Sequence, residues 1–237
     1  MTLGIYELIG FGPQGWGLPL INAAGITIAA AVSGFLLGSV LGVAGAVLKL
    51  SRRALLRAVG MFYTTVFRGI PEILIIYLFY FGGSVAFTKM MNLGGLPGFF
   101  SLPAFLIGVL AVGIVSGAYQ TEAYRAGFLR LDRGQIEAGL SCGMSDFLLL
   151  RRIIAPQALR FALPALGNIW QSVLKETALL SVIGLTELLR QSITAAGSTR
   201  EPLLFYGVAA VMFFVIGRVT GSLLSRTEKR LAKPWSR

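Results

Sequence analysis

Residues 20–48 read LINAAGITIAAAVSGFLLGSVLGVAGAVL, a stretch without a single Asp, Glu, Lys or Arg. An α-helix needs roughly 20 predominantly apolar residues to cross a bilayer, and this run is longer. A soluble domain would have to leave part of so long an apolar helix exposed to water. The stretch therefore predicts a membrane-spanning helix and places the chain among all-α membrane proteins.

The composition of the whole chain agrees with that class. Of its 237 residues, 55% are hydrophobic and 13% are charged, against about 25% charged in an average soluble domain. The net charge of +11 would suggest nucleic acid in a soluble chain, but in a membrane protein it marks cytoplasmic loops, so we expect no nucleic-acid partner. One cysteine and no histidine leave no Cys/His metal motif, and we expect no metal site.

Apolar stretches along the chain predict five membrane-spanning helices within one transmembrane domain, residues 1–237. The spans lie at about 20–48, 62–88, 102–123, 162–186 and 203–224. Fifteen of the 21 Lys and Arg residues fall after the first span, after the third span or in the C-terminal tail. The positive-inside rule then predicts an outside N-terminus and a cytoplasmic C-terminus, which an odd number of spans requires.

Two local signals bear on the packing and the boundaries of these spans. Gly34, Gly38 and Gly42 recur every fourth residue, which places them on one helix face and permits close helix approach. We favour packing within the chain over dimerisation for this face. Pro71 lacks a backbone N–H and disfavours helix at the residue before it, so we expect it to kink or begin the second span.

The cytoplasmic loop at about 125–161 is too long for a simple turn between two membrane helices. It predicts a helix over 134–142, a break at Gly143, and a second helix over 147–154 that Pro156 stops. Small residues keep the first helix slim near its tip, and such a helix is suited to enter a groove in a partner protein.

We expect Ser145 or Asp146 to cap the second helix of this loop. The apolar side chains that follow, Leu148–Leu150, are candidate anchors for the partner. The alternative is an amphipathic helix that lies at the lipid interface, held by Arg151 and Arg152.

Polar residues in the fourth span are the first candidates for a solute pathway. On a helical projection, Asn168, Gln171, Ser172, Lys175 and Glu176 share one face. Ionisable residues inside a membrane are costly and indicate function, and this stripe should face the bundle interior. Lys and Glu on one helix face would supply both counter-charges for a solute that carries a carboxylate and a cationic nitrogen; the alternative, equally weighted, is a structural ion pair.

Three further residues complete the candidate pathway: Tyr119, Glu122 and Glu72. Glu122 and Arg125 are three residues apart near the cytoplasmic end of the third span, and we favour a pair that fixes the helix end over a solute ligand. Arg68 stands four residues before Glu72, across Pro71, which favours a scaffold or gate element. No catalytic residues are predicted.

The cytoplasmic loop resembles the EAA loop of bacterial ATP-binding-cassette importer permeases, whose pattern is Glu-Ala-Ala-x3-Gly-x9-Ile-x-Leu-Pro. The matching residues are Glu137, Ala138, Gly139, Gly143, Ile153 and Pro156. The chain departs from the pattern at Gly139 and Ala155. Stretches 63–72, 117–122 and 161–171 are similar to the polar-amino-acid branch of that family, and residues 10–17 are similar to octopine and nopaline permease subunits.

The resemblance implies a type I importer permease with five spans, in which the loop between spans three and four is the helix that couples to an ATPase. It implies a bacterial inner-membrane assembly with a second permease subunit, identical or homologous, two ATP-binding subunits and a periplasmic solute-binding protein. ATP and Mg would sit on the ATPase, so this chain would bind no cofactor and would not be an enzyme.

Two functions of other classes remain as alternatives. The first is a secondary transporter or channel subunit without an ATPase, for which inverted repeats are expected, although five spans do not divide into two equal halves. The second is an intramembrane enzyme, for which a histidine-free chain offers no recognisable nucleophile and base.

Overall fold

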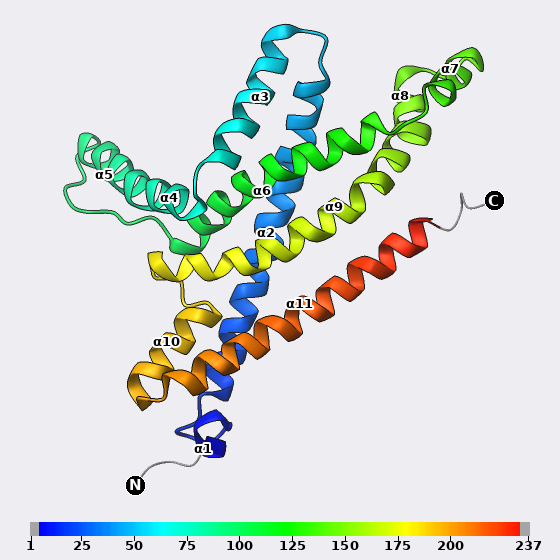
Figure 1. The fold of residues 1–237 in the computed structure, drawn as a ribbon. Helices are drawn as coiled ribbons and strands as arrows, with labels where there is room; N and C mark the ends of the chain where they lie inside the picture. The colour runs from blue at the N-terminus through cyan, green and yellow to red at the C-terminus, as the bar shows by residue number, and fades with distance from the viewer. Residues whose placement is uncertain (1–4, 233–237) are drawn as a thin grey trace. The chain divides into compact units, whose positions relative to one another are not determined.

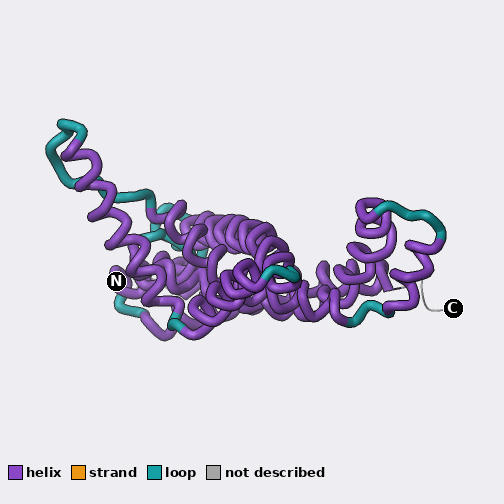
Figure 2. Tube along the Cα trace, turned by 90° about the horizontal axis from the view of Figure 1, so that it is seen from above, coloured by secondary structure: helices purple, strands orange, loops and turns teal. Residues whose placement is uncertain are grey.

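The computed structural model describes residues 5–232, and this part of the chain consists of helices and the loops that join them (Figures 1 and 2). The α-helices are α1 Ile5–Ile9, α2 Gly17–Leu50, α3 Ala54–Gly69, α4 Glu72–Tyr77, α5 Gly83–Leu93, α6 Ala104–Leu129, α7 Arg133–Ser141, α8 Asp146–Leu149, α9 Ala155–Glu176, α10 Leu188–Thr199 and α11 Pro202–Ala232. Wider π-helical turns occupy Leu78–Gly82 and Leu150–Ile154, and a 3₁₀ helix occupies Thr177–Ile183. The predicted all-α class is confirmed.

Four helical segments of the described chain are long and apolar enough to cross a membrane, judged by length and composition. They are Gly17–Leu50, Glu72–Leu93, Ala104–Leu129 and Pro202–Arg226. Each overlaps a predicted span. The fifth predicted span, 162–186, falls on α9 and the 3₁₀ helix after it, where the polar stripe lowers the mean hydropathy below that of the other four.

Pro71 separates α3 from α4, as predicted. The backbone of Ile70 and Pro71 is extended, with φ/ψ of −97°/135° and −56°/131°. Proline disfavours helix at the residue before it, and its fixed φ suits the entry to a new helix. The apolar segment therefore begins at Glu72 rather than near residue 62, and the residues before Ile70 belong to a separate helix.

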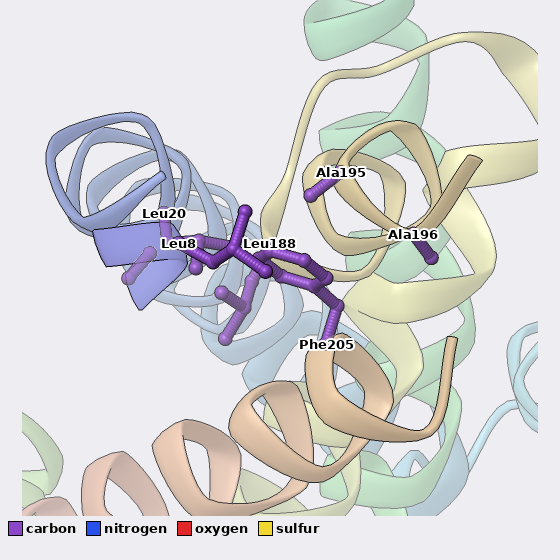
Figure 3. Packing of buried hydrophobic residues seen from close by; sticks show 7 residues of the cluster. Leu8, Leu20, Leu188, Ala195, Ala196 and Phe205 are labelled. Atoms are coloured by element: carbon purple, nitrogen blue, oxygen red, sulfur yellow. The ribbon is translucent and has the colours of Figure 1, made fainter. Parts of the chain in front are cut away.

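Backbone contacts divide the chain into two compact units. The first contains the described residues up to Gly34, Pro71–Val112 and Ser172–Arg218. Its core brings together Leu8, Leu20, Leu188 and Phe205, with Phe205 of α11 lying across Leu188 of α10 (Figure 3). Thr27 adds a polar link, because its hydroxyl accepts the first N–H of α10 at 3.0 Å.

The second unit contains Phe35–Ile70, Gly113–Gln171 and the described residues from Val219. Here α2 and α6 approach closely through Gly38, Gly42 and Gly45. A Cβ on Gly42 would lie 2.7 Å from the Gln120 Cβ and 3.2 Å from the Gln120 carbonyl carbon. Gly38 would meet the same helix, so the interpretation of this row as packing within the chain is confirmed for Gly38 and Gly42.

A polar contact fixes the register of the two close-packed helices. The Gln120 Nε2 donates to the Phe35 carbonyl at 3.1 Å, and its Oε1 accepts the Ser39 hydroxyl at 2.7 Å. Gln120 is fully buried. A buried amide must find such partners, because leaving one of its groups unpaired costs about 1–3 kcal/mol.

Candidate functional site

The first candidate site is the hairpin of α7 and α8, which we name the α7–α8 hairpin (residues 133–149). The Asp132 carboxylate accepts the Gly134 N–H at 2.9 Å and caps α7. At the other end, the Gly143 N–H donates to the Leu140 carbonyl and the Met144 N–H donates to the Gly139 carbonyl. This Schellman pattern needs a left-handed residue, and Gly143 has a φ of +76°. The predicted break at Gly143 is confirmed.

The second helix of the hairpin starts as predicted but does not stop as predicted. The Ser145 hydroxyl accepts the Leu148 N–H at 3.4 Å, which makes Ser145 the N-cap. The expected stop at Pro156 is wrong, because the chain passes through the π-helical turn at Leu150–Ile154 directly into α9. Within that wider turn the Ala155 N–H reaches the Leu150 carbonyl, and Pro156 falls in the first turn of α9, where a missing N–H is tolerated.

The motif residues of this loop divide into buried and exposed sets. Gly139 is buried, and a Cβ there would lie 2.6 Å from the Leu149 Cδ1 and 3.2 Å from the Ile153 Cδ1. Gly139 therefore lets the two arms of the hairpin close. The exposed motif residues are Glu137, Ala138, Gly143 and Pro156.

The outer surface of the hairpin, together with the π-helical turn Leu150–Ile154 that follows it, is apolar and basic. Phe147 is 71% exposed, and Leu140 and Leu150 are each 49% exposed. Arg151 and Arg152 are also exposed. Apolar side chains of this size on a small hairpin point to a surface that another protein or a lipid layer covers.

The second candidate site is a cavity of about 350 Å³, which we name the charged cavity. It is lined by Lys49, Thr64, Thr65, Arg68, Gly69, Tyr119 and Glu122. Lys49 lies in the last turn of α2, the threonines and Arg68 come from α3, and Tyr119 and Glu122 come from α6. The predicted candidates Tyr119 and Glu122 thus share one cavity.

Three cations surround the Glu122 carboxylate. The Lys49 Nζ donates to its Oε1 and also to the Thr64 hydroxyl, the latter at 2.9 Å. The Arg125 guanidinium lies 3.6 Å from Oε2 and the Arg68 guanidinium 3.9 Å from Oε1. The expected pair of Glu122 with Arg125 is present, but it is part of a larger cluster.

Lys49 is the member of this cluster that sequence reasoning missed, because it was counted as a loop charge. The row of small residues that faces α6 could have predicted that Lys49 also lies on this helix face. Gly38, Gly42 and Gly45 contact α6, and Lys49 follows Gly45 by four residues, on the same helix face.

The polar stripe of α9 lies on the surface of this chain. Trp170, Val173 and Leu174 are buried, whereas Ser172 and Lys175 are exposed. We had expected this stripe to face the interior of the bundle. Within the single chain it lies at the surface instead, because the opposite, apolar face gains more by burial. An exposed lysine in a membrane span needs a polar neighbour or water, since lipid tails offer neither.

The residues of the stripe have different neighbours. In the second unit, Asn168 and Gln171 line a cavity of about 200 Å³ with Gly221 and Ser225 of α11. In the first unit, the Glu176 carboxyl lies within hydrogen-bonding range of Glu72 at the start of α4.

Lys175, also in the first unit, lines a cavity of about 340 Å³ beside Tyr206 and Phe213. Within the described chain Lys175 forms no salt bridge with Glu176, so the structural ion pair that was the alternative to solute binding is not present. The neighbour that the Glu176 carboxyl does find is the Glu72 carboxyl.

Comparisons with known proteins place this architecture in context. The family model described as "Binding-protein-dependent transport system inner membrane component" matches residues 34–233. The chain is 50% identical to the octopine transport system permease protein OccQ of Rhizobium meliloti over 96% of both chains. It is 45% identical to the nopaline transport system permease protein NocQ of Agrobacterium fabrum over 94% of both.

A solved structure agrees with these relatives. The fold matches a chain of an amino acid ABC transporter crystallised with histidines, with a TM-score of 0.78 and 32% identity. The match covers 97% of this chain and 100% of that one.

Proposed function

This chain belongs to the family of binding-protein-dependent transport system inner membrane components, and from that premise we propose that it is the permease subunit of an ATP-driven importer for opines or polar amino acids. The observation that carries the proposal is the 50% identity to an octopine permease along nearly the whole chain. The fold match to an amino acid transporter at a TM-score of 0.78 supports the same solute class.

We further propose that α9 and the 3₁₀ helix after it form a fifth span in the bacterial inner membrane. Their polar stripe is exposed on this chain, and a second permease subunit, identical or homologous, would cover it and leave a hydrated path between the two. The clustering of Lys and Arg supports an outside N-terminus and a cytoplasmic C-terminus. A reporter fused after Arg237 should then be cytoplasmic and one near Gly94 external; the reverse pattern would contradict the orientation.

The α7–α8 hairpin is the proposed contact with the ATPase. Its arms are held together at Gly139, its tip is fixed by the Schellman cap at Gly143, and Phe147 and Leu140 are exposed on its surface. A rigid element of this kind transmits motion, because it moves as a body when the two ATPase subunits close. ATP and Mg would be held by those subunits, and this chain itself would bind no cofactor.

The single cysteine of the chain offers a direct test of this contact. Cys142 is exposed at the C-terminal end of α7. If the hairpin enters a groove of the ATPase, maleimide labelling of Cys142 should be fast in the permease alone and at least several-fold slower in the assembled complex. A matched control is the double change Cys142→Ser with Gly197→Cys, because Gly197 lies on the exposed part of α10 with open space around it.

Labelling at position 197 should be the same with and without the ATPase. Equal labelling of Cys142 in both states, with the ATPase shown to be bound, would contradict the proposed contact and favour a hairpin that lies on the lipid surface. Copurification of an ATP-binding subunit and a periplasmic binding protein with the tagged chain would separately support the importer assignment.

The solute path is proposed to run along the exposed polar stripe. Asn168, Gln171 and Ser172 would provide hydrogen bonds, and Lys175 a cation for a solute carboxylate. The neighbouring carboxyl groups of Glu72 and Glu176 suit the cationic nitrogen of an opine or a basic amino acid, because such a cation relieves the repulsion between two carboxylates.

A further inference from the structure

The charged cavity holds more positive than negative charge. Among its described lining residues, Lys49 and Arg68 face the single carboxylate of Glu122, which leaves one positive charge in excess, and Arg125 approaches the same carboxylate from outside the cavity. At partly shielded positions near a membrane, such an excess is relieved when an anion binds.

The three cations differ in how many hydrogen bonds they already form. Lys49 donates to both Glu122 and Thr64, and its side chain is only 13% exposed. Arg125 does not line the cavity. Arg68 lies 3.9 Å from the Glu122 Oε1, beyond the 2.7–3.2 Å of a hydrogen bond. Within the described chain, the planar donor fork of Arg68 is therefore free for another acceptor.

The orientation of Arg68 is nevertheless restricted. Its guanidinium carbon lies 5.1 Å from the centre of the Tyr119 ring, a cation–π distance. Stacking against a ring holds the guanidinium plane, so less rotamer freedom is lost when a ligand binds. The Thr65 side chain lines the same cavity and offers a hydroxyl donor beside it.

We propose that the charged cavity is a second carboxylate-binding site for the transported solute, in addition to Lys175 on the α9 stripe, with Arg68 as the bidentate ligand and the Lys49–Glu122 pair as the support that keeps Glu122 from occupying Arg68. This inference rests on the proposed function for its solute class. A planar guanidinium matches the two oxygens of a carboxylate, and octopine and the polar amino acids all carry that group. The cavity, about 350 Å³, is within the size range of small-molecule sites.

The test is a comparison of ligands that differ only in one carboxylate. The permease is reconstituted with its ATPase subunits in lipid nanodiscs, and equilibrium binding is measured for octopine, for its two monoamides, for arginine and for argininamide. Arg68→Gln should weaken binding of the carboxylate ligand by about 10- to 100-fold, the effect expected for a lost charge-assisted hydrogen bond. For the amide that replaces the recognised carboxylate, the same substitution should change affinity by less than about threefold.

Arg125→Gln is the matched control, because Arg125 and Arg68 are similarly exposed, at 40% and 43%, and both face Glu122. Arg125 itself does not line the cavity, and Lys49 still holds Glu122 when Arg125 is replaced, so octopine affinity should stay within about threefold. Arg68→Lys, which keeps the charge but loses the fork, should fall between wild type and Arg68→Gln. Assembly is checked by size-exclusion chromatography, and a variant that fails to assemble is replaced in the comparison by Arg68→Lys.

Several outcomes would overturn the site. Equal losses in Arg68→Gln and Arg125→Gln would show a general field effect rather than a ligand. If Arg68→Gln weakens the binding of the acid and of both amides equally, Arg68 does not recognise a carboxylate. If Arg68→Gln leaves solute binding unchanged but removes a dependence of ATPase activity on phosphatidylglycerol, the cavity holds a lipid headgroup instead. If the wild-type complex binds none of the probes, the proposed solute class fails and the site with it.

Discussion

The close approach of α2 and α6 predicts that two chemically identical substitutions in α2 will have opposite effects. Gly42→Ala would place a Cβ 2.7 Å from the Gln120 Cβ and 3.2 Å from backbone atoms of Gln120 and Thr121. Backbone cannot move aside without shifting α6. Gly25→Ala, in the same helix, would meet nothing within 4 Å.

The magnitude follows from a comparison of the two variants. Replacing a helical glycine with alanine gains up to about 1 kcal/mol of helix stability at either position. Overpacking against a fixed neighbour costs about 1–3 kcal/mol. The gain cancels between the two variants, so Gly42→Ala should be less stable than Gly25→Ala by about 1–3 kcal/mol. At about 2–4 °C per kcal/mol for a chain of this size, the melting temperatures should differ by a few to about 10 °C.

The assay is thermal unfolding of the detergent-purified complex, followed by the loss of the monodisperse peak in size-exclusion chromatography. Gly25→Ala should melt at or slightly above wild type and Gly42→Ala below it. Equal melting temperatures, or a Gly42→Ala variant above wild type, would refute the reasoning that α6 backbone blocks this position. Because Lys49 lies two turns further along the same face, Gly42→Ala should also loosen the contact of Lys49 with Glu122 and reduce solute-stimulated ATPase activity.

Three other predictions follow from single contacts. Gly143→Ala places a Cβ at a φ of +76°, which costs about 1–2 kcal/mol, so this variant should lower solute-stimulated ATPase activity while membrane insertion persists. The control Gly134→Ala, in the same hairpin, should keep that activity. An equal loss of activity in both variants would argue against backbone strain at the tip of the hairpin. Glu176→Gln should reduce uptake at limiting solute by removing a charge-assisted hydrogen bond of about 1.5–3 kcal/mol, whereas normal uptake by the double variant Lys175→Met with Glu176→Gln would eliminate the pair as the solute site. Thr27→Val leaves the first N–H of α10 unpaired and should lower the melting temperature through a cost of about 1–3 kcal/mol, while Thr27→Ser should stay close to wild type; similar melting of the two variants would show that water replaces the hydroxyl.

The sequence predicted features whose causes lie within a few residues. Pro71 ends one helix and begins another because of its own ring, and Gly143 ends α7 because its backbone can adopt a positive φ. Ser145 caps the next helix for the same local reason. Such signals act through neighbouring backbone atoms and can be read before the fold is known.

Features that depend on several elements could not be predicted in the same way. Pro156 was expected to stop a helix, but the π-helical turn before it made room for its ring. Glu72 and Glu176 are neighbours in the fold although they lie far apart in the sequence. The orientation of the α9 stripe depends on which face gains more apolar burial within the chain, and this depends on the surrounding helices.

The length of α2 has a consequence for the lipid around the protein. Its 34 residues extend about 51 Å at 1.5 Å per residue, against a hydrocarbon core of about 30 Å. The helix must therefore tilt steeply or project well beyond the acyl chains at one or both ends. Lys49 stands at the last turn of this helix, so bilayer thickness becomes a variable that sets the depth of its ammonium group. A thicker membrane would draw that charge towards the hydrocarbon, and a thinner one would leave it in the hydrated headgroup layer.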